Sequence, residues 1–250
     1  LRPTFGRITR YGAMVLSWSM DKPGPMCRSI EDCALVFNAI HGASEKDPAT
    51  ITAPFVYDRR VDLSTLRIGF DEDAPESFLE KLSELGANLR EMNELPNARM
   101  DQLGAESAAA FDYHIAPGGV EPEPLPEDLE PADRRRRGRF RRGRDMRALD
   151  YINGQRRRLI LMQEMAEAMD GFDMFVSGSG AVGLTNDTGP PAVIVPYGFG
   201  VRNPDADSPT TMPLTTTIVG DLFADDKILN VAQAFQSTTD WHVRRPAMDF

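Results

Sequence analysis

Six residues with the spacing of a phosphate-binding loop follow an apolar run in the second half of the chain. Gly178-Ser179-Gly180-Ala181-Val182-Gly183 matches the pattern G-x-G-x-x-G, in which the backbone approaches a dinucleotide pyrophosphate and a helix opens at the third glycine. Here Asn186-Asp187-Thr188-Gly189-Pro190-Pro191 follows within a few residues and prevents a long helix. The sequence therefore disfavours NAD or FAD and predicts a glycine-rich loop at a sheet edge, where it can line a pocket.

Side chains for nucleophilic catalysis are sparse. The three histidines are His41, His114 and His242. None of them lies in a motif, although a serine–histidine–acid triad needs a base within hydrogen-bond distance of its nucleophile. No G-x-S-x-G elbow occurs, because Ser177 stands where the motif around Ser179 needs its first glycine. Lys22 lies in a Pro/Gly loop, where we expect a solvated charge. We assign no catalytic residue to this chain.

Patterns for metal binding and for disulfides are also missing. The two cysteines, Cys27 and Cys33, are six residues apart, which fits neither C-x-x-C nor a dense disulfide framework. The sequence also lacks an H-x-x-x-H pair of ligands. We therefore expect buried or half-buried thiols in a reduced protein, with no metal site and no cofactor.

Charge is distributed unevenly over the 250 residues. The net charge of −10 argues against a surface that binds nucleic acid or membrane as a whole. The acidic, proline-rich run EPEPLPEDLEPAD is followed directly by eight arginines between Arg134 and Arg144. Because the two runs have opposite charge, internal pairing or a solvated face is favoured, and contact with RNA is the lesser alternative. We expect a flexible charged loop over residues 115–147.

Apolar periodicity predicts alternating helices and strands. Ser29 caps a predicted helix that ends at Gly42. A strand, a helix and a strand at 66–70, 75–85 and 87–92 form a predicted β-α-β excursion within residues 61–101. Further helices are predicted at 100–111, 149–169 and 225–238, and further strands at 172–177, 192–196 and 214–219. This alternation predicts an α/β layered fold, and no apolar run approaches the ~20 residues that span a bilayer.

Two of these elements carry a prediction about burial. Leu149, Ile152, Leu159, Met162, Ala166 and Met169 lie largely on one face of the long helix. Residues 156–158 are expected to point mostly outward, and Gly171 to end the helix. The run AVIVP at 192–196 is typical of a strand that is buried on both faces.

Phrases spread over most of the chain resemble the amidase signature family of serine hydrolases. Leu1 to Arg7, LRPTFGR, resembles the end of the phrase G-L-[KR]-P-T-x-G-R that closes the family's catalytic signature. Ser17 to Asp32 resembles S-x-D-x-x-G-P-[ML]-x-R-[ST]-[VI]-E-D. Thr185 to Pro196 resembles T-N-x-T-G-x-P-A-x-x-V-P, and two further segments resemble late family elements, Leu149 to Glu164 and Val219 to Phe235.

The resemblance implies a fold and a chemistry. The implied fold is a single three-layer α/β/α domain around a mixed sheet, of which residues 1–250 would be the C-terminal part, truncated at the N-terminal side. The implied chemistry is hydrolysis of a carboxamide through an acyl-enzyme, in which a lysine acts through a second serine on the nucleophilic serine. All three catalytic side chains would precede Leu1, so we expect this fragment to be inactive alone.

The same resemblance suggests residues around the site. We expect Ser19, Asp21, Gly24 and Pro25 to buttress the signature loop as active-site support. We expect Asn186, Thr188 and Gly189 to face the substrate cleft and bind substrate. Relatives often have Ser-Pro-Thr where this chain has Ser177 to Gly180, so we expect a looser loop there, able to reshape the pocket, and the sequence does not identify the amide.

The first interpretation of function is therefore a hydrolase of non-peptide C–N bonds that acts on a small-molecule amide. The alternatives are the glutamine-hydrolysing amidase subunit of a tRNA-dependent amidotransferase and a non-catalytic remnant that binds an amide ligand. The expected partner is the missing N-terminal part of the same enzyme, and a homodimer stays open. We expect a cytoplasmic protein without membrane contact, and a signal peptide in the missing part stays open as well.

Overall fold

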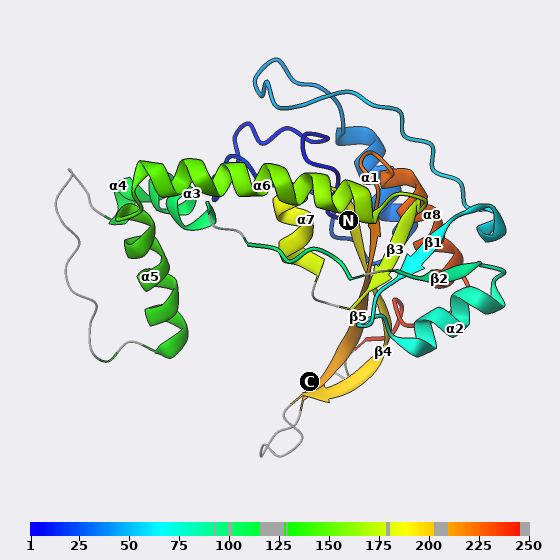
Figure 1. Ribbon diagram of the computed structural model, residues 1–250. Coiled ribbons are helices and arrows are strands. Elements are labelled where there is room, and N and C mark those ends of the chain that lie inside the picture. Colours follow the sequence, from blue (N-terminus) through cyan, green and yellow to red (C-terminus); the bar gives the residue numbers. More distant parts are fainter. Residues whose placement is uncertain are drawn as a thin grey trace.

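The computed structural model in Figure 1 describes residues 1–92, 94–99, 102–115, 128, 130–178, 181–202 and 210–245. A five-stranded sheet forms its centre, in the order β2-β1-β3-β5-β4. The strands are β1 (Ile68–Phe70), β2 (Leu89–Glu91), β3 (Met174–Ser177), β4 (Ala192–Arg202) and β5 (Thr210–Gly220). The first three strands in this order are parallel, whereas β5 is antiparallel to both of its neighbours. The predicted α/β fold around a mixed sheet is confirmed.

Alternation along β3 sends side chains to both faces of the sheet. Met174 and Val176 join a core with α1 (Ile30–Ile40), α2 (Glu76–Glu84) and α8 (Asp225–Gln236). Phe175 points the other way and packs with α6 (Ala148–Ala168) and α7 (Val182–Thr188). Successive side chains of a strand face opposite sides, so helices must cover both. Figure 1 shows the resulting three layers, with α6 and α7 on one side of the sheet and α1 and α8 on the other.

The elements predicted from strong local signals are present. Ser29 accepts a hydrogen bond from the backbone N–H of Asp32 and caps α1, as expected for a capping residue. A short 3₁₀ turn at Leu63–Thr65, then β1, α2 and β2, form the predicted β-α-β unit within residues 61–101, with β2 parallel to β1. The predicted helix at 100–111 is α3 (Leu103–Ala110), followed by the single turn α4 (Asp112–Ile115).

The expected flexible loop over residues 115–147 was wrong for its second half. Pro131–Arg144 is the helix α5, which begins with a proline in its first turn, where a missing N–H costs nothing. Phe140 contacts Phe111 at a centroid distance of 5.4 Å, and Gly143 lies directly on Gly104 of α3. The arginine run is thus an anchored helix; residues 116–127 and 129 lie outside the described part.

Most of the apolar residues expected on one face of α6 are exposed. Leu149, Ile152 and Leu159 are 56–61% exposed, whereas Met169, at the C-terminal end of the helix, is 5% exposed and joins the core with Leu161 and Met165. Both sets of apolar residues recur at helical spacing, and only tertiary contacts decide which one is covered. An apolar stripe along α6 is therefore left on the surface.

The strand at 192–196 also differs from expectation. β4 and β5 form an antiparallel pair of eleven-residue strands, and Ile194 is 39% exposed, so this strand is not buried on both faces. β4 is the edge strand of the sheet in the described residues, with Arg2 bridging to Ala192 beyond it. The outer part of the hairpin also exposes Val201 and Leu214.

The contact between α3 and α5 supplies a test of the anchored helix. A Cβ atom at Gly143 would lie 1.9 Å from the Gly104 carbonyl oxygen, whereas one at Gly138 would meet only the flexible end of Arg142 at 3.3 Å. We expect Gly143→Ala to lower the free energy of unfolding by about 1–3 kcal/mol through overpacking. Gly138→Ala should be neutral or stabilising by up to about 1 kcal/mol, because alanine favours helix. Urea unfolding followed by circular dichroism measures both, and equal effects would contradict the packing.

Candidate active-site scaffold

The first residues of the chain are held tightly inside the fold. The Leu1 amino group donates to the Pro25 carbonyl oxygen at 2.9 Å, and the Arg2 backbone exchanges two 2.7 Å hydrogen bonds with Ala192. A Cβ atom at Gly24 would lie 2.2 Å from the Leu1 carbonyl oxygen, so only glycine allows this approach. The loop with Gly24 and Pro25 therefore packs directly on the segment that follows the expected signature.

Thr4, two residues further along this segment, is held by hydrogen bonds to residues at the start of α8. Its backbone N–H and its hydroxyl each donate to the Asp225 carboxylate at 2.9 Å, and its hydroxyl accepts from the Phe223 N–H at 3.0 Å. Burial raises the pKa of Asp225, although both hydrogen bonds from Thr4 act in the lowering direction. A buried carboxylate at the start of α8 thus determines where the N-terminal segment runs.

Glu106 of α3 is the acceptor for a second set of donors. The hydroxyl of Ser19 donates to it at 2.7 Å and the Ser19 N–H at 3.1 Å, while the Ser17 hydroxyl makes a further short contact. From α6, the Tyr151 hydroxyl donates at 3.0 Å and the Gln155 amide at 3.1 Å. We call these five residues the Glu106 network. It joins the loop after the N-terminal segment to two helices.

Hydrogen bonding outweighs burial at this carboxylate. Glu106 is 5% exposed, and burial alone would raise its pKa, but hydrogen bonds from Ser17, Ser19 and Tyr151 hold the pKa below its usual range. Nearby, Asp21 accepts from the backbone N–H groups of Leu16 and Ser17 at 2.8 and 3.0 Å and shapes the same loop. The loop is therefore ordered by carboxylates from two sides.

Arg158 connects this loop to α7. It donates to the Ser19 carbonyl oxygen at 2.9 Å and to the Asp187 carbonyl oxygen at 2.6 Å. The Asp187 carboxylate accepts from Gln102 at 2.9 Å and from the Arg99 N–H at 3.0 Å. The expectation that residues 156–158 point outward was wrong for Arg158, whose guanidinium is engaged inside the fold.

Lys22 is half-buried rather than solvated, contrary to the sequence-based expectation. Its Nζ donates to the carbonyl oxygens of Thr185 at 3.0 Å and Pro190 at 2.8 Å, and so completes hydrogen bonding at the end of α7. Arg2 donates to the Thr185 hydroxyl at 2.9 Å and to the Asn186 side-chain oxygen. Burial, assisted by the nearby charge of Arg2, lowers the pKa of Lys22 to about 7.

The four expected support residues lie on one loop but have different partners. Gly24 and Pro25 contact Leu1, Asp21 accepts from the backbone of the same loop, and Ser19 donates to Glu106 of α3. Asn186 is linked to the N-terminal segment by the hydrogen bond that its side-chain oxygen accepts from Arg2.

Thr188 and Gly189 instead use their polar groups within the chain. The Thr188 hydroxyl donates to the Leu184 carbonyl oxygen, and the Gly189 carbonyl accepts from the Phe5 N–H at 3.0 Å. Ser179 and Gly180 of the glycine-rich loop lie outside the described residues.

Several residues of this scaffold carried no motif. Glu106 stands alone in LGAESAAA, and its neighbours there give no reason to expect a buried carboxylate. A signal did exist on α6, where Tyr151, Gln155 and Arg158 recur at positions i, i+4 and i+7, on one helical face. Polar residues at that spacing beside an apolar stripe indicate a buried polar contact.

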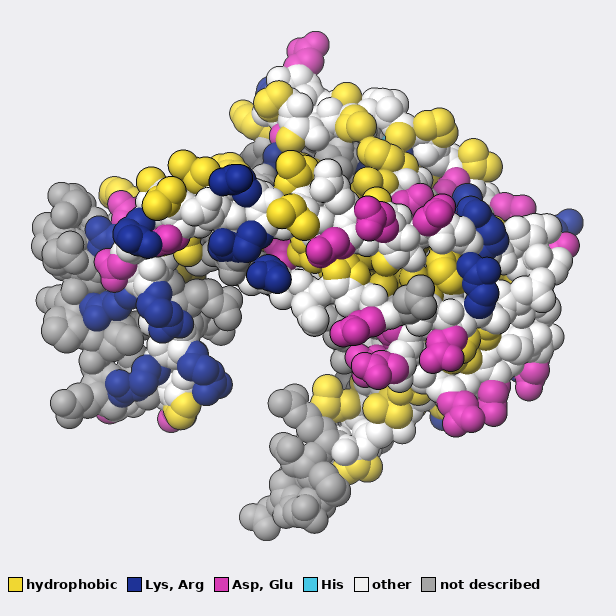
Figure 2. All heavy atoms as spheres, viewed as in Figure 1, with side chains coloured by type: hydrophobic (Ala, Val, Ile, Leu, Met, Phe, Trp, Pro, Cys, Tyr) yellow, Lys and Arg dark blue, Asp and Glu magenta, His cyan; other side chains and the backbone are white. Residues whose placement is uncertain are grey.

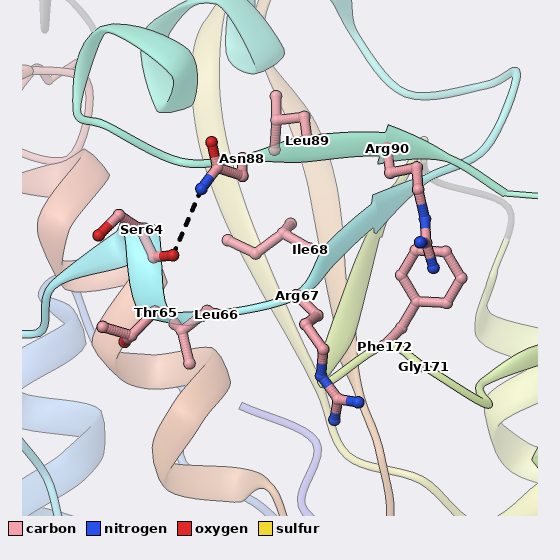
Figure 3. A pocket seen from close by; sticks show the side chains of 10 residues that line it. All are labelled: Ser64, Thr65, Leu66, Arg67, Ile68, Asn88, Leu89, Arg90, Gly171 and Phe172. Carbon is pink, nitrogen blue, oxygen red and sulfur yellow. Dashed lines mark hydrogen bonds between the residues drawn. The ribbon is translucent and has the colours of Figure 1, made fainter.

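One pocket lies away from these residues, at the amino ends of β1 and β2, and has a volume of about 370 Å³. Figure 3 shows Asn88 turned toward Ser64 and Arg90 lying over the Phe172 ring. Asn88 donates to the Ser64 carbonyl oxygen at 3.3 Å, Arg90 lies over the Phe172 ring at 4.5 Å, and Arg67 pairs with Asp173. None of the predicted site residues lines this pocket.

A complete catalytic arrangement is not present in the described ranges. There, no serine, threonine or cysteine side chain shares a hydrogen bond with the side chain of a histidine or lysine. Over the same ranges, no group of three or more His, Cys, Asp or Glu residues is arranged to hold a metal ion. No described helix has both the length and the apolarity needed to cross a bilayer.

Comparison with known proteins decides the family. Residues 1–185 match the family model described as Amidase. The chain belongs to the amidase family. A curated relative, the A subunit of glutamyl-tRNA(Gln) amidotransferase from Marinomonas sp. (strain MWYL1), is 26% identical over 305 residues, which cover 99% of this chain and 61% of that protein. The chain thus spans about three-fifths of that relative.

Two solved structures show the same amidase fold. The peptide amidase of Stenotrophomonas maltophilia superposes with a TM-score of 0.71 at 23% identity, covering 98% of this chain and 58% of that one. The A subunit of glutamyl-tRNA(Gln) amidotransferase from Thermotoga maritima superposes with a TM-score of 0.65 at 19% identity, covering 95% of this chain and 57% of that one. Family membership confirms the resemblance found in the sequence.

The Glu106 network predicts a large effect of a small substitution. Glu106→Gln replaces a carboxylate oxygen by an NH₂ group that faces hydroxyl and amide donors, so we expect a loss of about 2–4 kcal/mol of stability. Glu164→Gln, at an exposed position of α6, is the matched control and should change stability by less than about 0.5 kcal/mol. Urea unfolding at pH 7 compares the two variants.

The pH dependence provides a second readout of the same contact. Because the folded pKa of Glu106 lies below its unfolded value, ionised Glu106 adds stability above that unfolded pKa. This contribution is lost as the pH falls through the folded pKa. Glu106→Gln should remove the corresponding part of the acid-induced loss. Parallel stability curves of wild type and variant between pH 3 and 7 would contradict a lowered pKa.

Lys22 predicts a change of folding stability with pH on the alkaline side of neutrality. Its pKa is about 7 in the folded chain and 10.5 in the reference state, so between these values the unfolded chain binds more protons. Stability should therefore rise with pH over this interval, since a neutral amine still donates to both carbonyls. Lys22→Met should flatten the rise, whereas Lys46→Met, at an exposed lysine, should keep it. Unfolding midpoints between pH 6.5 and 9.5 measure the difference.

Proposed function

We propose that this chain is the scaffold part of an amidase that hydrolyses the C–N bond of a small-molecule carboxamide through a serine acyl-enzyme. In that reaction a serine oxygen attacks the carbonyl carbon, the amine leaves with a proton, and water releases the acid and regenerates the serine. The observation that carries the proposal is the anchoring of Leu1 to Thr4. Pro25, Ala192 and Asp225 hold this segment by hydrogen bonds, and Gly24 closes on it.

The catalytic side chains are supplied, on this proposal, by a part of the amidase fold that precedes Leu1. Two observations support this. The described residues lack a hydroxyl or thiol paired with a basic side chain of histidine or lysine, and the chain covers about 61% of a curated relative's length. Hydrogen bonds that position the segment after the signature would be of little use unless the signature were attached to it or docked beside it.

The preceding part has a surface to dock on. Figure 2 shows hydrophobic side chains gathered along α6, and the Glu106 network holds the neighbouring loop against this helix. The large exposed apolar residues of the two elements are Tyr11, Met14, Leu16, Trp18, Leu149, Ile152, Leu159, Ile160 and Met162. Exposed apolar side chains in this number favour a surface that is covered in the working protein. We propose that the preceding part of the amidase fold covers it.

Two alternatives remain within reach of experiment. The curated relative of Marinomonas is named as one subunit of a glutamyl-tRNA(Gln) amidotransferase, which favours glutamine as the amide. A non-catalytic remnant would keep the scaffold and bind an amide without cleaving it. The general amidase ranks first, because the segment from Ser17 to Gly42 resembles general amidases more closely.

The proposal predicts activity only for the completed protein. We expect the isolated chain to hydrolyse an aryl anilide and to release ammonia from glutamine at the uncatalysed rate. The same chain extended by the amidase segment that precedes it, or co-expressed with that segment, should turn over amides. Faster hydrolysis of the anilide supports the general amidase, and ammonia release from glutamine supports the amidotransferase function.

Two outcomes would contradict the proposed function. Turnover by the isolated chain that disappears on substitution of one of its own residues would place the chemistry within these 250 residues. A completed protein that binds amides without hydrolysing either substrate would identify the remnant. In both cases circular dichroism and gel filtration verify that the tested protein is folded.

A further inference from the structure

α5 carries a concentrated positive charge in an acidic protein. Residues 131–144 contain eight arginines and one aspartate, a net charge of +7, whereas the whole chain carries −10. Figure 1 shows α5 beyond the end of α6, away from the sheet, and Figure 2 shows basic side chains clustered over it. The proposed amidase scaffold gives this helix no role.

One face of α5 fixes the helix to the rest of the protein. Gly143 packs on Gly104, Phe140 on Phe111, and Arg144 pairs with Asp112 at 3.1 Å. Phe140, Gly143 and Arg144 are three and four residues apart and therefore share a face. These contacts hold the helix in place from one side.

The opposite face presents arginines in register. Arg135 and Arg142 are seven residues apart, two turns of helix or about 10 Å, and point away from the anchored face. Both are exposed, and neither forms an ion pair with the described part of the chain. The sequence favoured internal pairing or a solvated face for these charges, and in the described residues Arg144 is paired with Asp112 whereas Arg135 and Arg142 are exposed.

We propose that α5 binds the phosphate backbone of a nucleic acid. Guanidinium groups match phosphate oxygens with two parallel hydrogen bonds, and rows of arginine at helical spacing follow a regular array of phosphates. The single aromatic residue of α5 faces Phe111, so base stacking is not used and binding is independent of sequence. RNA and DNA share this chemistry, and the experiment separates them.

Other polyanionic partners fit the helix less well. An interfacial membrane helix needs an apolar face opposite its basic one, and the anchored face of α5 is already occupied by α3 and Phe111. A stable protein interface needs an apolar centre within a polar rim, and the face with Arg135 and Arg142 offers none. A repeated charge without apolar contacts fits a phosphate backbone.

The site is connected to the scaffold through one helix. Gly104 and Ala108 of α3 face α5, because a Cβ atom at Gly143 would contact both residues. Glu106 lies on the opposite side of the same helix and holds the loop with Ser17 and Ser19. A ligand on the arginine face of α5 is therefore separated from the loop with Ser17 and Ser19 by two packed helices, α5 and α3.

The test measures binding of labelled 20-base-pair RNA and DNA duplexes of one sequence by fluorescence anisotropy, from 50 to 200 mM KCl. With about four phosphates neutralised, the affinity should fall about 150-fold over this range. The variant Arg135→Ala/Arg142→Ala should bind at least about tenfold more weakly at 50 mM, with a log–log salt slope smaller by about 2. Tighter binding of one duplex identifies the physiological class.

Two further variants separate the mechanism from general charge. Arg60→Ala/Arg245→Ala removes two exposed arginines elsewhere and should leave affinity within about twofold. Arg135→Lys/Arg142→Lys keeps the charge and the salt slope but should bind more weakly, because ammonium groups cannot make the paired contact. Circular dichroism confirms that each variant folds, which is expected for exposed side chains.

Three results would overturn the inference. The first is absence of binding to either duplex at 50 mM KCl. The second is binding that Arg135→Ala/Arg142→Ala and Arg60→Ala/Arg245→Ala weaken equally, which indicates attraction to the whole surface. The third is binding to phosphatidylserine vesicles or to polyglutamate with equal or greater affinity. The amidase assays are independent of all three, so neither proposal stands or falls with the other.

Discussion

A carboxylate that is taken out of water must be met by hydrogen-bond donors, and the rest of this scaffold is arranged around that requirement at Glu106. A buried unsatisfied carboxylate costs several kcal/mol, so Ser17, Ser19, Tyr151 and Gln155 have to converge on it. This convergence fixes the loop, α3 and α6 relative to one another. Asp225 imposes the same requirement on Thr4, so one carboxylate fixes the N-terminal segment and the other fixes the loop that follows it.

The sequence predicted the elements whose signals are local. Ser29 caps α1 through a contact three residues away, and Gly86 and Gly171 have positive φ angles where predicted helices end. It failed where burial depends on distant residues. On α6, the stripe with Leu149 and Leu159 and the stripe with Leu161 and Met165 have similar periodicity, and only the position of the sheet decides between them. The charged composition likewise suggested a flexible loop where α5 lies. The helix is anchored by the packing of Gly143 on Gly104, and no local sequence pattern reveals that contact.

The residues expected around the active site came from a family resemblance and not from local chemistry. Ser19, Asp21, Gly24 and Pro25 were named through their likeness to a family phrase, and of these Gly24 and Pro25 contact Leu1, whereas Ser19 and Asp21 bond Glu106 and Leu16. Glu106 and Lys22 were missed. A lone glutamate among alanines and a lysine between Asp and Pro look solvent-exposed in sequence, and their burial follows from segments more than 80 residues away.

The exposed apolar stripe of α6 and the exposed arginine face of α5 differ in the free energy of their hydration. Burying apolar side chains such as Leu149 and Ile152 would stabilise the protein by about 25 cal/mol for each Å² removed from water. Their stripe therefore favours a partner that stays bound. Arginines on α5 are well solvated, and their exposure carries no such cost. A charged face therefore suits a partner that binds and leaves as ionic conditions change. The proposed lasting contact, through apolar side chains, therefore lies on α6, and the proposed reversible contact, through arginines, lies on α5. Between α5 and the loop with Ser17 and Ser19 lies α3, and α6 helps to hold that loop through Tyr151.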